Sequence, residues 1–135
     1  MLLIAALFAC SMPNHQFELD EGRERWTENA PSHYRYVQDE WAFADSVGPV
    51  RIEVLDGEIV SAVVVETDEP APDERALTID DLFDMVQDEI DEDPYDLDVV
   101  YDEDLGFPAT VDVDPIKNAM DDEHGFSAEQ FEILE

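Results

Sequence analysis

The chain has 135 residues, enough for a single hydrophobic core, and 44% of them are hydrophobic, a share typical of globular proteins. Its charge is extreme, because 37 acidic residues against 6 Lys and Arg give a formal net charge of −31. Nucleic acid and anionic lipid headgroups would be repelled by this charge, so neither is expected as a partner. Cations and basic protein surfaces remain as possible partners.

Three interpretations of the acidity compete. The carboxylates can form a solvated surface adapted to high salt, supply calcium sites, or form a face that docks onto a basic partner. They are spread from Glu18 to Glu135, which favours the solvated surface and a halophilic adaptation. Repulsion among so many like charges destabilises the folded state at low ionic strength, and salt screens it.

The chain begins with an apolar run, residues 1–9, that stops at Cys10, its only cysteine. The run is too short to span a bilayer as a helix. Leu7-Phe8-Ala9-Cys10 resembles the lipobox of bacterial lipoproteins, in which cleavage precedes a cysteine that carries the lipid. We therefore predict a signal segment over residues 1–9, lipidation at Cys10 and a tether over residues 10–17. The protein would be exported and anchored to the bacterial cell envelope membrane, on its periplasmic or outer side.

The alternative for the amino terminus is a first core helix over residues 2–9 with Cys10 as an inert buried thiol. No basic residue precedes the apolar run, and the run is shorter than a usual secretory leader. A start codon assigned too far downstream explains both features. The order of apolar run, small residue, cysteine and polar segment favours export.

After the tether, residues 18–29 have the composition of a helix, which Gly22 weakens and Pro31 ends. Aromatic residues then predict a half-buried strand over residues 33–37 that extends towards residue 44. The clearest local signal is a hairpin over residues 50–65. There two β-branched runs flank Asp56-Gly57, a dipeptide suited to a type I′ turn.

The second half of the chain predicts a helix, a hairpin and a last strand. Thr78 caps the helix, with Asp81 in a near capping box, and apolar residues recur at helical spacing up to Ile90. Residues 95–101 and 109–114 each alternate at period two and form a second hairpin with a longer loop. A short extended segment, residues 126–134, can add a strand.

Strands joined by short turns pair antiparallel, and the central helix must bury its apolar stripe against one sheet face. The sequence therefore predicts an α+β fold in a single domain over residues 18–135. The domain would have an antiparallel sheet of about five or six strands, with the central amphipathic helix packed on one face as a two-layer sandwich. An N-terminal helix completes it.

Several motifs cover most of the chain after residue 25. They are Trp26 before Tyr34-x-Tyr36, Pro49-Val50-Arg51-x-x-Val54 with its Asp56-Gly57 turn, Thr78-Ile79-x-x-Leu82-Phe83, Tyr101-Asp102-x-x-x-Gly106-Phe107-Pro108 with Asp114, and Asp121-Asp122-Glu123-x-Gly125-Phe126. In this combination the chain resembles a family of bacterial lipoproteins whose shared domain has no established function. The resemblance implies an export signal and a mixed fold, and it implies no activity.

One departure from that family concerns a Cys-x-Cys pair. Members often carry the pair at the end of the first strand, where this chain reads Trp41-Ala42-Phe43-Ala44. Any disulfide or thiol role of the pair is therefore missing here.

A calcium site is one hypothesis for the second hairpin. Clustered oxygen ligands are what a hard cation such as Ca²⁺ needs, and the candidate ligands are Asp102, Asp104, Asp112 and Asp114. The loop lacks EF-hand spacing, and the alternation of Asp112 and Asp114 is equally explained as the solvent face of a strand. The sequence suggests no other cofactor.

The same loop has a structural and a recognition interpretation. In the first, Asp102 accepts backbone N–H bonds and Gly106 takes a positive φ, so that Tyr101-Asp102 and Gly106-Phe107-Pro108 build a turn. In the second, an aromatic residue and a proline held on a rigid hairpin form a contact surface for a partner.

Catalytic motifs are missing from the sequence. His15, His33 and His124 are far apart, and there is no nucleophile elbow, glycine-rich phosphate loop or zinc motif. A small envelope hydrolase is therefore the weakest alternative. We expect a non-enzymatic lipoprotein that binds or scaffolds an unknown protein or envelope component through its sheet face and the loops around Gly48 and Gly106. A calcium-dependent interaction module is the other alternative.

Overall fold

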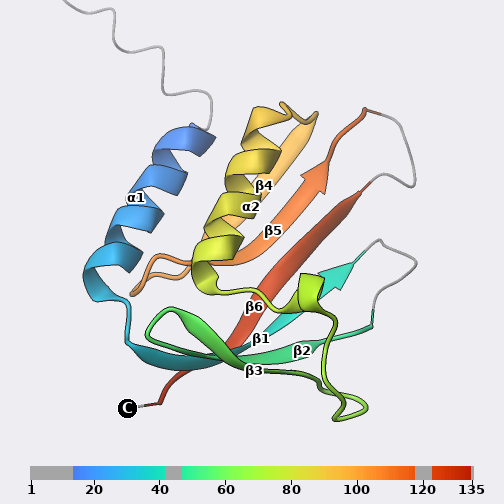
Figure 1. The fold of residues 1–135 in the computed structure, drawn as a ribbon. Helices are drawn as coiled ribbons and strands as arrows, with labels where there is room; N and C mark the ends of the chain where they lie inside the picture. The colour runs from blue at the N-terminus through green and yellow to red at the C-terminus, as the bar shows by residue number, and fades with distance from the viewer. Residues whose placement is uncertain (1–13, 42–46, 118–122, 135) are drawn as a thin grey trace, which may run out of the picture.

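The computed structural model describes residues 14–41, 47–117 and 123–134 (Figure 1). The predicted signal segment, Cys10 and residues 42–44 of the predicted first strand lie outside these ranges. In chain order the elements are α1 (His15–Asn29), β1 (His33–Trp41), β2 (Val50–Leu55), β3 (Glu58–Val64), η2 (Asp73–Arg75), α2 (Ile79–Asp91), β4 (Asp96–Tyr101), β5 (Pro108–Asp114) and β6 (His124–Ile133).

The strands form one six-stranded sheet in the order β3-β2-β1-β6-β5-β4, and every neighbouring pair is antiparallel. The chain thus runs twice through a helix followed by three strands, and the two triplets join where β1 pairs with β6. Both helices lie side by side on one face of the sheet (Figure 1). The predicted α+β fold is confirmed.

The first helix begins earlier than the sequence indicated. Asn14 is its N-cap and accepts a hydrogen bond from the backbone N–H of Phe17 at 2.9 Å, as Asn does at this position. The expected tether over residues 10–17 is therefore wrong at its end, because α1 already occupies His15 onwards. Residues 30 and 31 end the helix, since a residue before proline disfavours helical geometry.

Local sequence signals placed the first hairpin and the second helix correctly. Asp56 has φ 52° and Gly57 φ 83°, the pair of positive angles that a type I′ turn requires. At α2 the Thr78 side chain accepts from the N–H of Asp81 at 3.1 Å, and Asp81 accepts from the N–H of Thr78 at 2.9 Å. The capping box is complete.

Two tyrosines of β1 fix the start of α2 on the sheet. The Tyr34 hydroxyl accepts from the N–H of Ile79 at 3.0 Å, and the Tyr36 hydroxyl donates to the carbonyl of Leu77 at 2.6 Å. Burial raises the pKa of Tyr34 to about 12 and that of Tyr36 well above its usual value. Both phenols therefore stay protonated and keep these bonds at neutral pH.

The expected last strand forms as β6, and the sequence had not indicated its position in the sheet. β6 runs for ten residues and lies between β1 and β5, at the centre of the sheet. Gly125 allows this, because a Cβ atom there would lie 2.0 Å from the carbonyl oxygen of Val111 and 2.6 Å from the Trp41 ring.

The core lies between the helices and the sheet. An aromatic cluster at its centre joins Trp26 of α1, Tyr34 of β1, Phe107 and Phe131, with ring centroids between 4.8 and 6.1 Å apart for the Trp26–Phe107, Tyr34–Phe131 and Phe107–Phe131 pairs. Burial of this apolar surface is the main stabilising contribution.

None of the described helices has the length and apolar character needed to cross a membrane.

A buried arginine ties η2 to the sheet. Arg75 donates to Oε1 of Gln38 from Nε at 3.2 Å and from Nη2 at 2.9 Å, and to the carbonyl of Gly48 at 3.2 Å. Glu40 lies 3.7 Å from its Nε. Burying a charge without partners is costly. These hydrogen bonds and the nearby carboxylate therefore stabilise the buried guanidinium of Arg75.

Candidate functional site

The predicted recognition loop joins β4 to β5 and is closed by Asp102. Its Oδ2 accepts from the N–H groups of Asp104 at 3.1 Å and Leu105 at 2.8 Å. Its own N–H donates to the carbonyl of Phe107 at 2.8 Å, and Gly106 has φ 88°. The turn that the sequence predicted at Asp102 and Gly106 therefore forms.

The apolar residues of this loop point into the protein. Phe107 is 3% exposed, its ring lies 4.8 Å from that of Phe131, and Pro108 is buried. Tyr101 is half-buried against Gly22 of α1, and burial raises its pKa to about 12. Phe107 and Pro108 thus anchor the loop to the core, and they are not exposed for contact with a partner.

The predicted calcium ligands do not converge. In the hairpin, Tyr101 is opposite Pro108 and Asp96 is opposite Asp114, so Asp114 lies at the far end of β5 from the loop that holds Asp102. From Pro108 to Asp114 the strand advances by six residues, which corresponds to about 20 Å. Within the described ranges, no group of three or more His, Cys, Asp or Glu side chains is arranged to hold a metal ion.

A different surface emerges on the side of the sheet away from the helices, where no described element covers the strands (Figure 1). Strand residues alternate between the core and this side, which we call the open face. In β1, for example, Tyr34, Tyr36 and Gln38 are buried while Arg35 and Val37 are partly exposed.

Four aspartates share one corner of the open face. Asp96 of β4 lies opposite Asp114 of β5, and Asp98 lies opposite Asp112; we call these four residues the aspartate ladder. Like charges directly opposite each other destabilise a sheet. The Oδ1 atom of Asp114 is also buried with no hydrogen-bond partner among the described residues. An unsatisfied buried acceptor is costly, and a donor from outside could satisfy it.

A second feature of the open face is a hollow of about 260 Å³ beside the seam between β1 and β6. Its lining residues are Arg35, Tyr36, Val37, Arg51, Gln130 and Glu132. Arg35 binds Glu132 at 2.6 Å, and no ion pair in the described part of the chain involves Arg51. The hollow therefore combines two guanidinium groups with one carboxylate.

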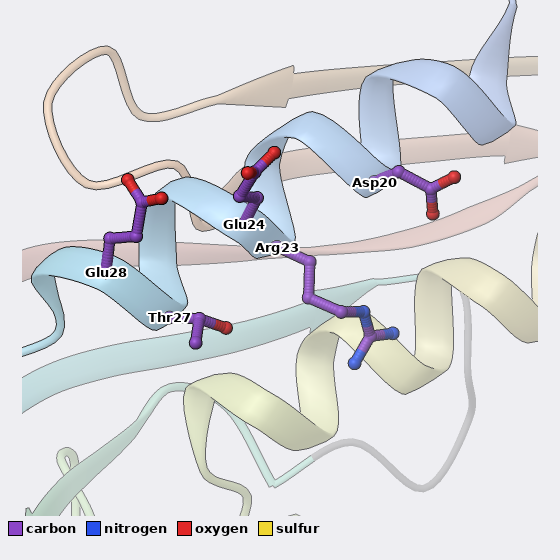
Figure 2. A pocket seen from close by; sticks show the side chains of 5 residues that line it. All are labelled: Asp20, Arg23, Glu24, Thr27 and Glu28. Carbon is purple, nitrogen blue, oxygen red and sulfur yellow. The ribbon is translucent and has the colours of Figure 1, made fainter.

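A further hollow, of about 350 Å³, lies along the outside of α1 (Figure 2). All of its lining residues come from that one helix: Asp20, Arg23, Glu24, Thr27 and Glu28. Their side chains diverge: Glu24 and Glu28 point away from α2, while Arg23 turns towards α2 and binds Asp84 at 3.4 Å (Figure 2). Such an open, divergent set does not form a binding pocket.

Comparison with models of protein families identifies the family of this domain. A model of a family of unknown function, DUF6174, matches residues 18–133. The chain belongs to DUF6174. The match agrees with the resemblance found in the sequence at the level of a domain without assigned function. Comparison with curated proteins and with solved structures finds no match.

The two open-face features of this DUF6174 domain were missed by sequence reasoning. The alternating aspartates of residues 96–98 and 112–114 were visible, but their pairing depends on strand register, which the loop between them sets. Arg35 and Arg51 are far apart in sequence and become neighbours only because Arg51 lies opposite Val37. The sequence feature that could have indicated the hollow is the presence of two arginines at outward strand positions. The whole chain has only 6 Lys and Arg residues.

Proposed function

We propose that this chain is an exported, lipid-anchored and non-enzymatic binding domain of the bacterial cell envelope, which docks a basic segment of a partner protein on the aspartate ladder. The observation that carries the docking proposal is the pairing of Asp96 with Asp114 and of Asp98 with Asp112. Cationic side chains placed over these pairs would relieve their repulsion and give specificity by charge complementarity.

Two further features support this occupant. The buried Oδ1 of Asp114 needs a hydrogen-bond donor, and Lys or Arg of a partner supplies donors. Val100, on the same face of β4 as Asp98, is 55% exposed and adds apolar contact area beside the charges. The mixture of a charged patch and an apolar residue is typical of protein interfaces.

The anchor part of the proposal depends on Cys10 and the polar residues after it. Cys10 is four residues before Asn14, the cap of α1, and four extended residues span at most about 14 Å. A lipid on Cys10 would therefore hold the start of α1 close to the membrane surface. The partner would be another component of that envelope.

The anchor is tested by fractionation of the native envelope. Wild-type protein should be recovered with the membranes, and Cys10→Ser should release it into the soluble fraction. Mass spectrometry of the native protein should show a lipid on the sulfur. An intact Met1 with an unmodified thiol would overturn this part of the proposal.

The docking surface is tested with a lysine-rich dodecapeptide titrated calorimetrically into the folded protein in 0.3 M NaCl. Asp98→Asn combined with Asp112→Asn should weaken binding at least about tenfold, since two charge-assisted contacts are lost. The control, Asp20→Asn with Asp88→Asn, removes the same charge from exposed positions of the two helices. Equal losses in the two double variants would show that the peptide senses only net charge.

A further inference from the structure

The hollow beside Arg35 and Arg51 is built around a β-bulge. Across the β1–β6 seam Arg35 is opposite Glu132 and Val37 is opposite Glu129, so that Tyr36 alone faces two residues of β6. One of these, Gln130, has φ 54°, an angle that costs energy in a residue with a side chain. Bulges of this kind commonly redirect side chains beside functional sites.

The charges around the hollow are unevenly matched. Glu132 is bound to Arg35 at 2.6 Å, and Glu53, which lies opposite Arg35, is bound to His33 at 2.6 Å. Arg51 also lines the hollow and has no ion pair with any described acid. The two arginines carry two positive charges and Glu132 carries one negative charge, so the hollow has a local charge of +1. This local charge is positive although the net charge of the whole chain is −31.

The strand register places Arg35 and Arg51 on the same face of the sheet as diagonal neighbours. Arg35 lies opposite Glu53, and Arg51 is two residues from Glu53 on the same strand. Diagonal neighbours of this kind are about 7–8 Å apart. A single carboxylate fits between two guanidinium groups at that spacing. The Tyr36 side chain is on the other face, where it binds Leu77, so Tyr36 can line the hollow only through its main chain.

We propose that this hollow is a binding subsite for one carboxylate group, held by Arg35 and Arg51. A planar carboxylate matches the fork of a guanidinium in a bidentate pair. A phosphate dianion is the poorer match, because the site offers a single uncompensated positive charge and the rest of the chain repels each added negative charge. The volume of about 260 Å³ is below that of pockets for whole small molecules, which suits the acidic end of a larger ligand.

The carboxylate can come from a small organic acid or from the C-terminus or acidic side chain of a peptide. This carboxylate subsite is independent of the lipid anchor and of the aspartate ladder, because different residues form it. Arg51 has a binding role in this subsite, in addition to its place in the sheet.

The direct test is NMR of the ¹⁵N-labelled full chain, with acetate replacing chloride stepwise at 1 M sodium. We expect saturable shifts of the Arg35 and Arg51 Nε–H signals and of the Tyr36 and Gln130 amides. Arg51→Gln should weaken acetate binding at least about tenfold, because charge-assisted bonds are lost. Arg25→Gln is the matched control on α1, and it should bind acetate as the wild type does.

Further variants keep the test decisive if Arg51→Gln fails to fold. Arg51→Lys keeps the charge without the planar fork and should bind with intermediate affinity, whereas Glu132→Gln removes the competing carboxylate and should tighten binding severalfold. Shifts that stay linear in acetate, or equal affinities of wild type, Arg51→Lys and Glu132→Gln, would overturn the proposal. Tighter binding of phosphate than of acetate would overturn the assignment to a carboxylate.

The source of the carboxylate is separated by two peptide arms. A peptide with a free C-terminal carboxylate is compared with its amidated form, and a peptide with an internal glutamate is compared with its glutamine form. Loss of binding on amidation identifies a C-terminus, and loss on Glu-to-Gln replacement identifies a side chain. If acetate binds and all four peptides do not, the site takes a small free acid.

Discussion

Gly22 of α1 and Gly106 of the β4–β5 loop contact each other through their main chains. A Cβ atom on Gly22 would lie 2.7 Å from the carbonyl oxygen of Gly106, and one on Gly106 would lie 2.5 Å from that of Gly22. This contact explains why a glycine that weakens the helix is present in its middle. It joins the helix of one half of the chain to the second hairpin.

We predict that Gly22→Ala destabilises the protein, although alanine is the better helix former by about 1 kcal/mol. The new methyl group would meet both the Gly106 carbonyl and the Tyr101 ring, and overpacking of this kind costs about 1–3 kcal/mol. Urea unfolding in 2 M NaCl measures the change. Gly106→Ala should cost more, because φ is 88° there.

Gly57→Ala is the control for this prediction. Gly57 has φ 83°, and a Cβ atom there meets nothing within 4 Å, so its substitution reports backbone strain without a clash. If Gly106→Ala cost no more than Gly57→Ala, the close contact between α1 and the loop would carry no energetic weight.

We predict that Arg75→Leu destabilises the protein by about 3–5 kcal/mol, the usual cost of removing one member of a buried charged network. Gln38 would lose its strongest bonds, and the carbonyl of Gly48 would lose the donor at 3.2 Å. A double-mutant cycle with Gln38→Leu checks the mechanism. Additive effects of the two substitutions would mean that the bonds between Arg75 and Gln38 do not contribute to stability.

We predict that stability falls between about pH 10 and pH 12. In the unfolded chain the phenols ionise near pH 10, whereas burial raises the pKa of Tyr34 to about 12 and holds that of Tyr36 well above its usual value. The folded state therefore keeps protons that the unfolded state releases. The stabilisation is full below pH 10 and is lost as pH rises through the folded pKa.

Denaturant unfolding at pH 8, 10 and 11.5 tests the alkaline loss of stability. Tyr36→Phe should unfold more easily at pH 8, because its bond to Leu77 is lost, and should show a flatter profile above pH 10. Tyr95→Phe, at an exposed position, should follow the wild-type profile. A wild-type profile that is flat up to pH 12 would contradict the prediction.

We predict that the unfolding midpoint rises steeply between 0.05 M and 2 M salt, equally with sodium and potassium chloride, because salt screens the repulsion. Asp98→Asn should raise stability by about 0.2–1 kcal/mol at low salt by removing one like-charged cross-strand pair, and the gain should shrink at 2 M. A response to salt that Asp98→Asn leaves unchanged would place the repulsion elsewhere than in the aspartate ladder.

The elements that depend on short stretches of sequence were predictable. The Asp56-Gly57 turn and the Thr78–Asp81 capping box are set by neighbouring residues, and both formed as expected. The start of α1 was missed because the Asn14 cap was assigned to the tether. The turn role of Asp102 was also predictable, since its carboxylate accepts hydrogen bonds from residues two and three positions away.

Contacts between distant segments were not predictable in the same way. The pairing of Asp98 with Asp112, the approach of Arg51 to Arg35 and the meeting of Gly22 with Gly106 all depend on register and packing. A single sequence carries no local pattern for any of them. The four candidate calcium ligands do not converge for the same reason, because residues at opposite ends of a hairpin are far apart in space although they are close in the sequence.

The seam between β1 and β6 has a consequence for how the protein reaches its folded form. Arg35 and Glu132, which pair across it, are 97 residues apart in the chain, and contacts of such long range form slowly. A chain that emerges amino end first exposes one unpaired side of β1 until β6 has been synthesised. During that interval the mutual repulsion of its many carboxylates would keep unfinished copies from joining edge to edge, so the same acidity that weakens the finished domain protects the nascent one.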